Sequence, residues 1–462
     1  MTPAALLIAL TLFSVGAFWI GKSRSLALVG GSRGVRNLHS LPGHYGLMTA
    51  LWCALPALLV MGLWLAFQDA IILRLITDHL PAGVRSLPAN DLSLVMNDVR
   101  NLVAGNVPAD SVSDAVRAAS AEYIEFRGIS RMALTVLIMV MAIAAVITIR
   151  SRITPQLRAR NSVERVIEWL LIGCSTIAVF TTIGIVASVA FEAFRFFSII
   201  HPFDFLFGTS WSPQMAIRAD QVGSSGSFGA VPLFAGTALI SFIAMFIAVP
   251  IGLFSAIYLA EYAHPKFRTW AKPLLEVLAG VPTVVYGFFA ALTIGPALRG
   301  WGESFGLNVA SESALAAGFV MGIMIIPFVS SLADDMISAV PQSLRDGAYA
   351  LGATRSETIK QVVMRAALPG IVGGVLLAVS RAIGETMIVV MAAGLAANLT
   401  ANPLEAVTTV TVQIVTLLVG DQEFDSPKTL AAFALGLVLF LVTLALNVLA
   451  LHIVRKYREQ YE

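Results

Sequence analysis

Long apolar runs recur along the whole chain and are separated by mostly short polar loops. A helix needs roughly 20 apolar residues to cross the hydrocarbon core of a bilayer, which is about 30 Å thick. The pattern therefore predicts an all-α, polytopic membrane protein with about nine transmembrane helices. We place them at about 3–20, 47–67, 132–149, 167–191, 234–258, 274–298, 313–338, 368–394 and 429–454.

Some of these runs are interrupted, notably by four prolines, Pro250, Pro282, Pro296 and Pro327. Such breaks are compatible with spans because neighbouring helices satisfy the backbone groups that a break frees. A further apolar stretch at about 406–420 is rich in Thr and Val. It is too short and too polar for a full span, so we expect a re-entrant or surface helix there.

Composition supports this picture. Of the 462 residues, 57% are hydrophobic and 13% are charged, whereas soluble domains carry about 25% charged residues. The net charge of +2 gives no reason to expect nucleic-acid binding. Cys53 and Cys174 both lie inside apolar runs, which argues against a disulfide framework or a CxxC metal site.

The basic residues of the loops indicate the orientation of the chain. Lys and Arg gather in alternate loops, at about 21–46, 150–165 and 266–272, and in the tail after residue 454. Short cytoplasmic loops carry such an excess, so these loops are predicted to be cytoplasmic. The first apolar run lacks a preceding basic segment and a clear cleavage site, and is expected to be a retained span. Nine spans then put the N-terminus outside and the C-terminus in the cytoplasm.

The loop at about 68–131 falls on the predicted external side, holds eight acidic residues against six Arg, and contains the longest hydrophilic stretch, at 75–127. Within it, the run Asp110–Asp114 precedes an Ala-rich segment, which predicts a capped amphipathic helix. Two interpretations stay open for this stretch: a plain helical cap, or a docking surface for an extracytoplasmic partner.

Gly16–Ser23 matches the phosphate-loop pattern GxxxxGK[ST]. That chemistry needs a loop between a strand and a helix whose exposed N–H groups surround phosphates. Here bulky apolar residues fill the pattern at the end of a predicted span. ATP chemistry is therefore expected on another chain.

The cytoplasmic segment from Pro341 to Gly374 is the most informative stretch. A helix starting near Ser343 puts Leu344, Ala348 and Leu351 on one face by their i, i+4, i+7 spacing. Gly352 then ends that helix, and a second one is expected to begin near Ser356. Two short helices with an apolar edge suit docking into a groove of a partner; an ordinary interhelical loop is the alternative.

Asp346–Gly352 resembles the EAA loop of ABC importer permeases, in which Glu-Ala-Ala is followed by three residues and Gly. Two departures are present: Asp346-Gly347 replaces Glu-Ala, and Met364-Arg365 stands where that family has Leu-Pro. Further segments, in this order, resemble the C subunit of bacterial phosphate (Pst) importers: Phe207–Pro213 with Phe228 following, Ala256–Tyr262, Glu276–Gly287 and Ser380–Met387.

The resemblance covers about 166–456. It implies a six-helix type I permease core at 166–462, a coupling loop at about 340–366, and an N-terminal extension with three spans at 1–165. The chain is then half of a phosphate pathway in the bacterial inner membrane, and carries out no covalent chemistry and needs no cofactor. The coupling residues it implies are Leu344, Asp346, Gly347, Ala348, Leu351 and Gly352.

The same resemblance implies three kinds of protein partner besides membrane lipid. They are a homologous second permease subunit of the PstA type, a cytoplasmic ATPase dimer of the PstB type and an extracytoplasmic phosphate-binding protein of the PstS type. No nucleic-acid partner and no metal site are expected.

Arg381 and Glu385 lie four residues apart in an otherwise apolar span, so they are predicted to share a helix face. Charges within the membrane are costly, which makes the pair a candidate for the substrate pathway. A guanidinium fork suits an oxyanion such as phosphate, and Glu385 would orient it. The alternative is a buried pair that only fixes helix packing.

Three other functions stay open from the sequence alone. A permease for sulfate or molybdate would use the same architecture. An ion-coupled secondary transporter would predict internal inverted repeats and acidic residues at mid-membrane; no repeat is visible, and Glu385 is the one mid-span acid with an obvious role. A non-transporting sensor subunit would fail in uptake assays.

Overall fold

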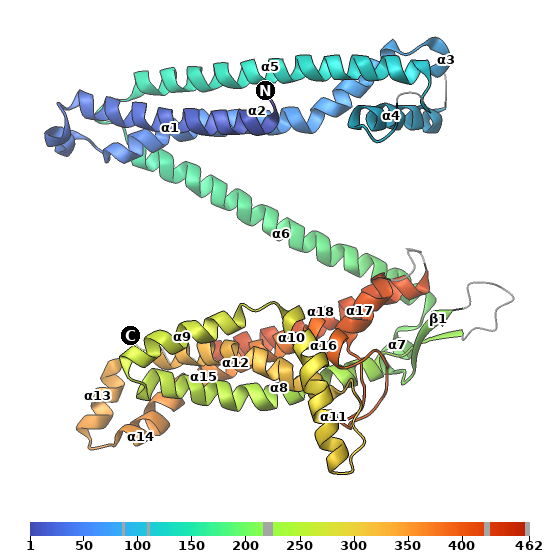
Figure 1. Ribbon diagram of the computed structural model, residues 1–462. Coiled ribbons are helices and arrows are strands. Elements are labelled where there is room, and N and C mark those ends of the chain that lie inside the picture. The colour runs from blue at the N-terminus through green and yellow to red at the C-terminus, as the bar shows by residue number, and fades with distance from the viewer. Residues whose placement is uncertain (86–87, 109–110, 216–224, 420–425, 458–462) are drawn as a thin grey trace. The chain divides into compact units, whose positions relative to one another are not determined.

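The computed structural model describes residues 1–462 except 86–87, 109–110, 216–224, 420–425 and 458–462 (Figure 1). The chain forms two compact units, Met1–Val179 and Phe180–Glu462, and each is considered by itself. Their boundary falls after Val179, inside helix α6 (Ala159–Ile199), whereas the sequence pattern predicts a division at 165–166.

The first unit contains three long helices that lie side by side (Figure 1): α1 (Pro3–Leu28), α2 (Pro42–His79) and α5 (Asp114–Arg152). A 3₁₀ turn at Ser32–Asn37 joins the first two. Their contact is apolar, with Leu10, Cys53 and Ile138 among the residues fully buried in it. The second unit holds the segments that resemble importer permeases.

At roughly 1.5 Å per residue, α2 and α5 are each almost twice as long as the hydrocarbon core is thick. Their extensions pack against α3 (Ala82–Arg85) and α4 (Ala89–Ala104) around a second apolar cluster that includes Ile76, Val99 and Tyr123. The predicted hydrophilic stretch is thus helical. Its capped helix begins at Asp114, where Ser113 accepts a hydrogen bond from the Val116 N–H, and it continues without a break into the span; Asp110 lies outside the described residues.

In the second unit the end of α6 is followed by α7 (Pro202–Phe207) and by an antiparallel hairpin of β1 (Trp211–Met215) and β2 (Ser225–Phe228), in which Trp211 pairs with Phe228. The sequence analysis did not predict this hairpin. The helices that follow are α8 (Val231–Ile257), α9 (Pro265–Ala279), α10 (Thr283–Phe289), α11 (Gly295–Ser304), α12 (Ala314–Ser338), α13 (Gln342–Ala350), α14 (Arg355–Glu357), α15 (Met364–Ile383), α16 (Met387–Ala392), α17 (Val410–Val419) and α18 (Pro427–Tyr457).

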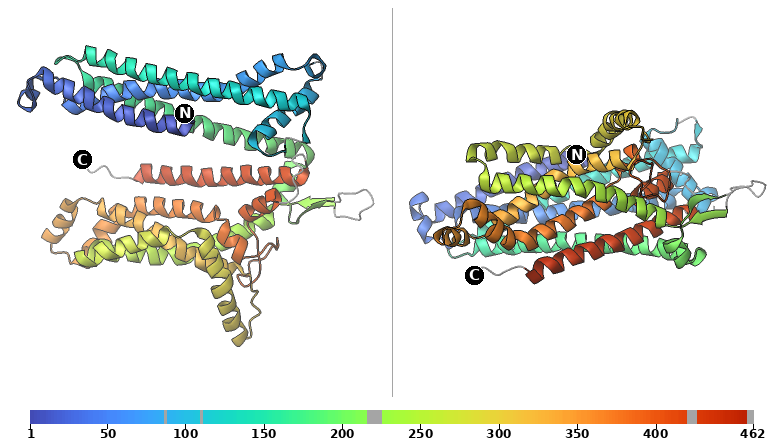
Figure 2. Two further views of the ribbon diagram at one scale, coloured as in Figure 1. Left: turned by 45° about the horizontal axis from the view of Figure 1, so that its top comes forward. Right: turned by 90° about the horizontal axis from the view of Figure 1, so that it is seen from below.

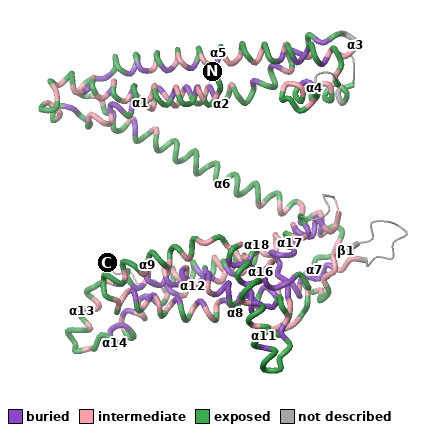
Figure 3. Tube along the Cα trace, viewed as in Figure 1, coloured by how far each residue is buried: buried purple, intermediate pink, exposed green. Residues whose placement is uncertain are grey.

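Helix α12 is the innermost element of this unit. It packs against α8 and α15, and the three lie side by side in Figures 1 and 2. Buried residues run along its length (Figure 3), and Gly318 explains how closely α8 approaches. A Cβ on Gly318 would lie 2.7 Å from the Ile243 Cβ, so only glycine fits. Small residues at helix contacts are how membrane helices come close enough to pack well.

Eight helices in the described part of the chain are long and apolar enough to cross a membrane, and a ninth span exists if the bent pair Pro265–Ala279 and Thr283–Ser304 counts as one. The predicted all-α polytopic fold is confirmed. Two predicted spans need correction. The run 274–298 is bent by 84°, and the run 368–394 is not one helix because α15 ends at Ile383.

The stretch at 406–420 contains α17, a helix of 10 residues. This length is too short to cross a bilayer, in agreement with the sequence analysis. The residues of its first turn are buried, among them Thr411 and Gln413. Its first turn therefore packs inside the unit, whereas Val415, Leu418 and Val419 in its second half are exposed.

Candidate functional site

Helix α13 and the turn after it form the predicted coupling segment. The helix begins at Gln342, one residue before the predicted start, and ends at Ala350. Gly352 has φ +87°, a conformation that favours glycine because it has no Cβ. The Gly352 N–H donates to the Tyr349 carbonyl at 2.9 Å, and the Ala353 N–H to the Ala348 carbonyl at 3.1 Å. These bonds satisfy carbonyls at the helix end, and the predicted break at Gly352 is confirmed.

The second helix begins with a capping box. The Thr354 hydroxyl accepts a hydrogen bond from the Glu357 N–H, and the Glu357 carboxylate accepts one from the Thr354 N–H at 2.8 Å. The helix continues through a π-helical turn at Thr358–Val363 directly into α15. It is therefore the start of the next span and not a separate short helix. Met364-Arg365 stands within this continuous run.

The apolar face proposed from spacing is only partly present. Leu344 packs against an apolar cluster that includes Ile337 and Val363, and Ala348 is half-buried. Leu351, by contrast, is 90% exposed. The i+7 position falls beyond the last helical residue, where the chain turns away, so the three side chains do not share one environment. The role of these three residues in docking stays a prediction.

The outer surface of α13 carries the other predicted coupling residues. Asp346 is exposed, and its carboxylate accepts a hydrogen bond from the Gln342 amide at 3.0 Å. Gly347 is exposed, with open space around it. With Tyr349, which is 41% exposed, and Leu351, these residues form a small mixed surface on the projecting loop.

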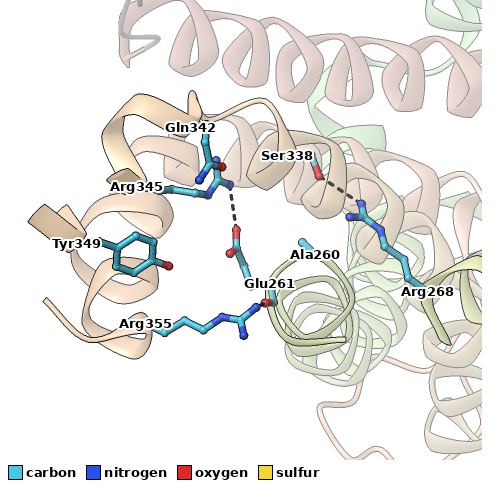
Figure 4. Close-up of a pocket in the computed structure, with 8 residues that line it drawn as sticks. All are labelled: Ala260, Glu261, Arg268, Ser338, Gln342, Arg345, Tyr349 and Arg355. Carbon is cyan, nitrogen blue, oxygen red and sulfur yellow. Dashed lines mark hydrogen bonds and ion pairs between the residues drawn. The ribbon is translucent and has the colours of Figure 1, made fainter. Parts of the chain in front are cut away.

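Beneath this loop lies a charge cluster that the sequence analysis missed (Figure 4). The Arg345 guanidinium is 2.9 Å from the Glu261 carboxylate, and both side chains are only 11% exposed. Arg345 also donates to the carbonyls of Ile337, at 2.9 Å, and Val340. The Arg355 guanidinium donates to the Glu261 carbonyl and lies 5.3 Å from the centre of the Tyr262 ring.

These residues border an open pocket of about 610 Å³, lined by Ala260, Glu261, Arg268, Ser338, Gln342, Arg345, Tyr349 and Arg355 (Figure 4). A second acid, Asp334 on α12, is 5% exposed and pairs with Arg268 at 3.0 Å and with Lys272 at 2.8 Å. Both cations lie on α9. Asp334 thus ties α9 to α12, and Glu261 ties the end of α8 to α13.

Arg381 and Glu385 do not form the predicted arrangement. Helix α15 ends at Ile383, and Glu385 lies in the break before α16. The i, i+4 geometry needs a continuous helix, and Gly384 ends this one. Within the described residues no ion pair joins the two side chains. The shared helix face is therefore wrong, whereas the pathway role stays a prediction.

Each residue of that pair has other contacts. The Arg381 guanidinium lies 5.7 Å from the centre of the Phe328 ring, and its side chain is exposed. The Glu385 carboxylate accepts a hydrogen bond from the Met387 N–H at 3.2 Å, and its carbonyl accepts one from the Thr411 hydroxyl at 2.8 Å. Glu385 thus stabilises the backbone at the break, and within the described residues no hydrogen bond occupies the Arg381 donors.

Two helix pairs of this unit are broken: α9 and α10 at a bend, and α15 and α16 at the break that contains Glu385. The second helices of the two pairs, α10 and α16, pack on each other. The contact is tight at Gly287, where a Cβ would lie 3.1 Å from the Met387 carbonyl oxygen. Irregular backbone within apolar segments is tolerated where it is buried in protein or lines a water-filled cavity. Two such breaks are a suitable place for a polar substrate to pass.

Two protein-family patterns match the chain. Residues 7–181 match a family described as phosphate ATP-binding cassette transporter, and residues 248–459 match the binding-protein-dependent transport system inner membrane component. A probable ABC transporter permease protein, YqgH of Bacillus subtilis, is 30% identical over 59% of this chain and 85% of its own length.

Two relatives carry a more specific name. The phosphate transport system permease protein PstC of Xylella fastidiosa is 32% identical over 53% of this chain and 76% of its own length. PstC 1 of Mycobacterium tuberculosis is 33% identical over 54% of this chain and 81% of its own. With the helical architecture above, these matches show that the chain belongs to the PstC-type family of ABC transporter permeases.

Proposed function

We propose that this chain forms one half of the translocation pathway of an ATP-driven importer of inorganic phosphate. It is a multi-pass inner-membrane permease subunit of an ABC transporter, as its family membership and apolar helices show. Phosphate as the substrate is supported by the names of its relatives and by the family matched at residues 7–181. An exposed arginine beside a broken helix suits an oxyanion of this kind.

The proposed complex contains a homologous second permease subunit, a cytoplasmic ATPase dimer and an extracytoplasmic phosphate-binding protein. The N-terminus of this chain lies outside and its C-terminus lies in the cytoplasm, as the charges of the loops favour. α13 then faces the ATPase. The domain division is part of this proposal: 166–462 carries transport, and 1–165 is an extension to that core.

The observation that carries the proposal is the exposed end of α13. Leu351 is 90% exposed beside the tight turn at Gly352, although a leucine side chain gains free energy from burial. An apolar residue on a projecting loop suits a groove of a partner chain. We assign Asp346, Gly347, Leu351 and Gly352 to contact with the ATPase, and Leu344 and Ala348 to anchoring the helix beneath.

In this arrangement ATP-driven closure of the ATPases draws the coupling helices of the two permease subunits together. The permease helices then move between an outward-facing and an inward-facing state. Arg381 offers its guanidinium to the anion on the pathway, while Glu385 orients the unwound segment next to it. Neither residue has to perform bond chemistry.

Copurification tests this proposal. The chain, expressed with its candidate partners, is expected to hold the ATPase subunits through detergent extraction, and the external binding protein loaded with phosphate is expected to raise ATP hydrolysis. Leu351→Asp is expected to weaken retention of the ATPase. Leu307→Asp, which changes an exposed leucine on the segment after α11, is the matched control. Normal retention in Leu351→Asp would remove this loop as the docking element.

A further inference from the structure

We propose that Glu261 is a positioning residue that locks the coupling helix α13 onto the end of α8, so that movement of the helix is delivered to α8. This inference rests on the proposed docking of α13 onto an ATPase. It adds a residue outside the coupling loop to the transmission of movement. Glu261 lies 84 residues before its partner Arg345 in the sequence.

Arginines from both ends of the coupling segment donate hydrogen bonds to Glu261. Its carboxylate accepts from Arg345, within α13, and its carbonyl accepts from Arg355, after the turn at Gly352. The Arg355 guanidinium also lies over the ring of the neighbouring Tyr262. Two contacts on opposite sides of the turn restrict rotation of the segment as well as its distance from α8.

Arg345 joins a third element to this lock. Its guanidinium donates to the carbonyls of Ile337 and Val340, at the end of α12, in addition to Glu261. Arginine suits this task because its planar fork presents several donors in fixed directions. α8, α12 and α13 are therefore held together at one point. α8 and α12 also pack closely on each other at Gly318. They are therefore expected to move as a pair.

Burial makes the lock depend on the Glu261–Arg345 pair. Both side chains are 11% exposed, so water and salt compete little for either charge. Besides this pair, Leu344 packs against the apolar cluster and Ala348 is half-buried, whereas Asp346, Gly347 and Tyr349 are exposed. Removing one partner would leave the other charge nearly buried and unpaired.

Arg268, a third cation of this pocket, does not compete for the Glu261 carboxylate. Arg268 lines the same pocket (Figure 4), but its guanidinium donates to Asp334 at 3.0 Å and to Ser338 at 3.4 Å. The chain thus keeps two separate pairings, Glu261 with Arg345 and Asp334 with Arg268. The local geometry also favours the pairing of Glu261 with Arg345, because the π-helical turn at Tyr258–Tyr262 shifts Glu261 from the register of an ideal α-helix.

The experiment uses the complete transporter in proteoliposomes and measures phosphate uptake per ATP hydrolysed. Glu261→Gln removes the charge but keeps the size of the side chain and an oxygen that can accept from Arg345, and Arg345 keeps its bonds to the Ile337 and Val340 carbonyls. We expect normal retention of the ATPase and continued ATP hydrolysis, with uptake per ATP lowered by about tenfold or more, the change that about 1.4 kcal/mol of lost coupling produces. Glu303→Gln, in the exposed pair with Arg299 on α11, is the control and should leave this ratio unchanged.

The reversed pair Glu261→Arg/Arg345→Glu tests whether the two residues act together. Recovery of uptake per ATP to within about threefold of the wild type would support the lock, because the interaction energy of a pair shows as non-additivity. Arg345→Lys, which keeps the charge but not the fork, should lie between wild type and Glu261→Gln.

Two results would overturn the lock. One is a wild-type ratio of uptake to hydrolysis in Glu261→Gln. The other is loss of the ATPase from Glu261→Gln, since that assigns the pair to assembly and not to transmission of movement. If the wild-type chain itself retains no ATPase or takes up no phosphate, the proposed function fails instead, so the two failures are distinguishable.

Discussion

At the scale of single residues, the structure changes the account of Arg381. The sequence predicts a pair with Glu385, but the helix ends between them and Arg381 stays exposed over Phe328. A nearly buried pair would make either single substitution destabilising. An exposed arginine without that partner predicts a stable variant with a functional defect.

Arg381→Gln is therefore expected to assemble normally and to lose phosphate uptake by about tenfold or more, since the guanidinium fork is what an oxyanion recognises. Uptake and copurified ATPase are measured on the same preparation, and Arg299→Gln serves as the control. The double variant Arg381→Gln/Glu385→Gln should remain defective. Recovery of uptake in that double variant would instead assign the two residues to packing.

Gly352 and Gly347 form a matched pair of glycines in the coupling segment. Gly352 has φ +87° in open space, so Gly352→Ala adds backbone strain of about 1–2 kcal/mol and no clash. Gly347 is helical, and Gly347→Ala should stabilise α13 by about 0.8–1 kcal/mol. Amide hydrogen exchange of α13 is expected to become faster in the first variant and slower in the second. The same direction of change in both would contradict this account of the turn.

At the scale of elements, the sequence predicted those features that depend on neighbours in the chain. Apolar runs marked the long helices because burial of a helix in lipid depends on its own composition. The end of α13 was predictable because Gly352 follows the predicted helix and glycine readily adopts positive φ. The exposure of Leu351 was not, because it depends on where the chain turns after Ala350. The bend before Thr283 and the end of α15 at Ile383 also depend on packing between α10 and α16.

The charge clusters were missed for a related reason. Glu261 and Arg345 are 84 residues apart, and Arg268 and Asp334 are 66 apart. Local spacing cannot pair such residues, and a single acid at the end of an apolar run is usually solvated. One usable signal was present: Asp334 lies inside a predicted span, where a charge needs a partner.

Asp334 ties α9 to α12, and its neighbour supplies the control. Asp334 is 5% exposed and holds two cations, whereas Asp335 is 59% exposed. Asp334→Asn is expected to lower the free energy of unfolding by about 2 kcal/mol, less than for a fully buried pair because Arg268 and Lys272 are partly exposed. Asp335→Asn should change it by less than about 0.5 kcal/mol. Thermal unfolding of the purified protein measures both, and equal effects would contradict a structural role specific to Asp334.

At the scale of the whole molecule, orientation in the membrane decides whether α13 reaches a cytoplasmic ATPase. In a background without Cys53 and Cys174, a single cysteine at Ser111 is expected to react with an impermeant reagent added to intact cells. One at Ser356, at the start of the helix after Gly352, should be protected until the membrane is opened. Labelling of Ser356→Cys from outside would put the coupling segment on the wrong side and contradict the importer assignment.

The account's central claim is that this chain is the permease through which ATP hydrolysis drives phosphate inward. The most direct measurement is uptake of radiolabelled phosphate by proteoliposomes that contain the purified complex, with the external binding protein outside and ATP enclosed. The account predicts uptake that requires both ATP and the binding protein and that excess sulfate or molybdate does not suppress. ATP-dependent uptake of sulfate or molybdate in place of phosphate, or phosphate uptake that persists without ATP, would contradict it.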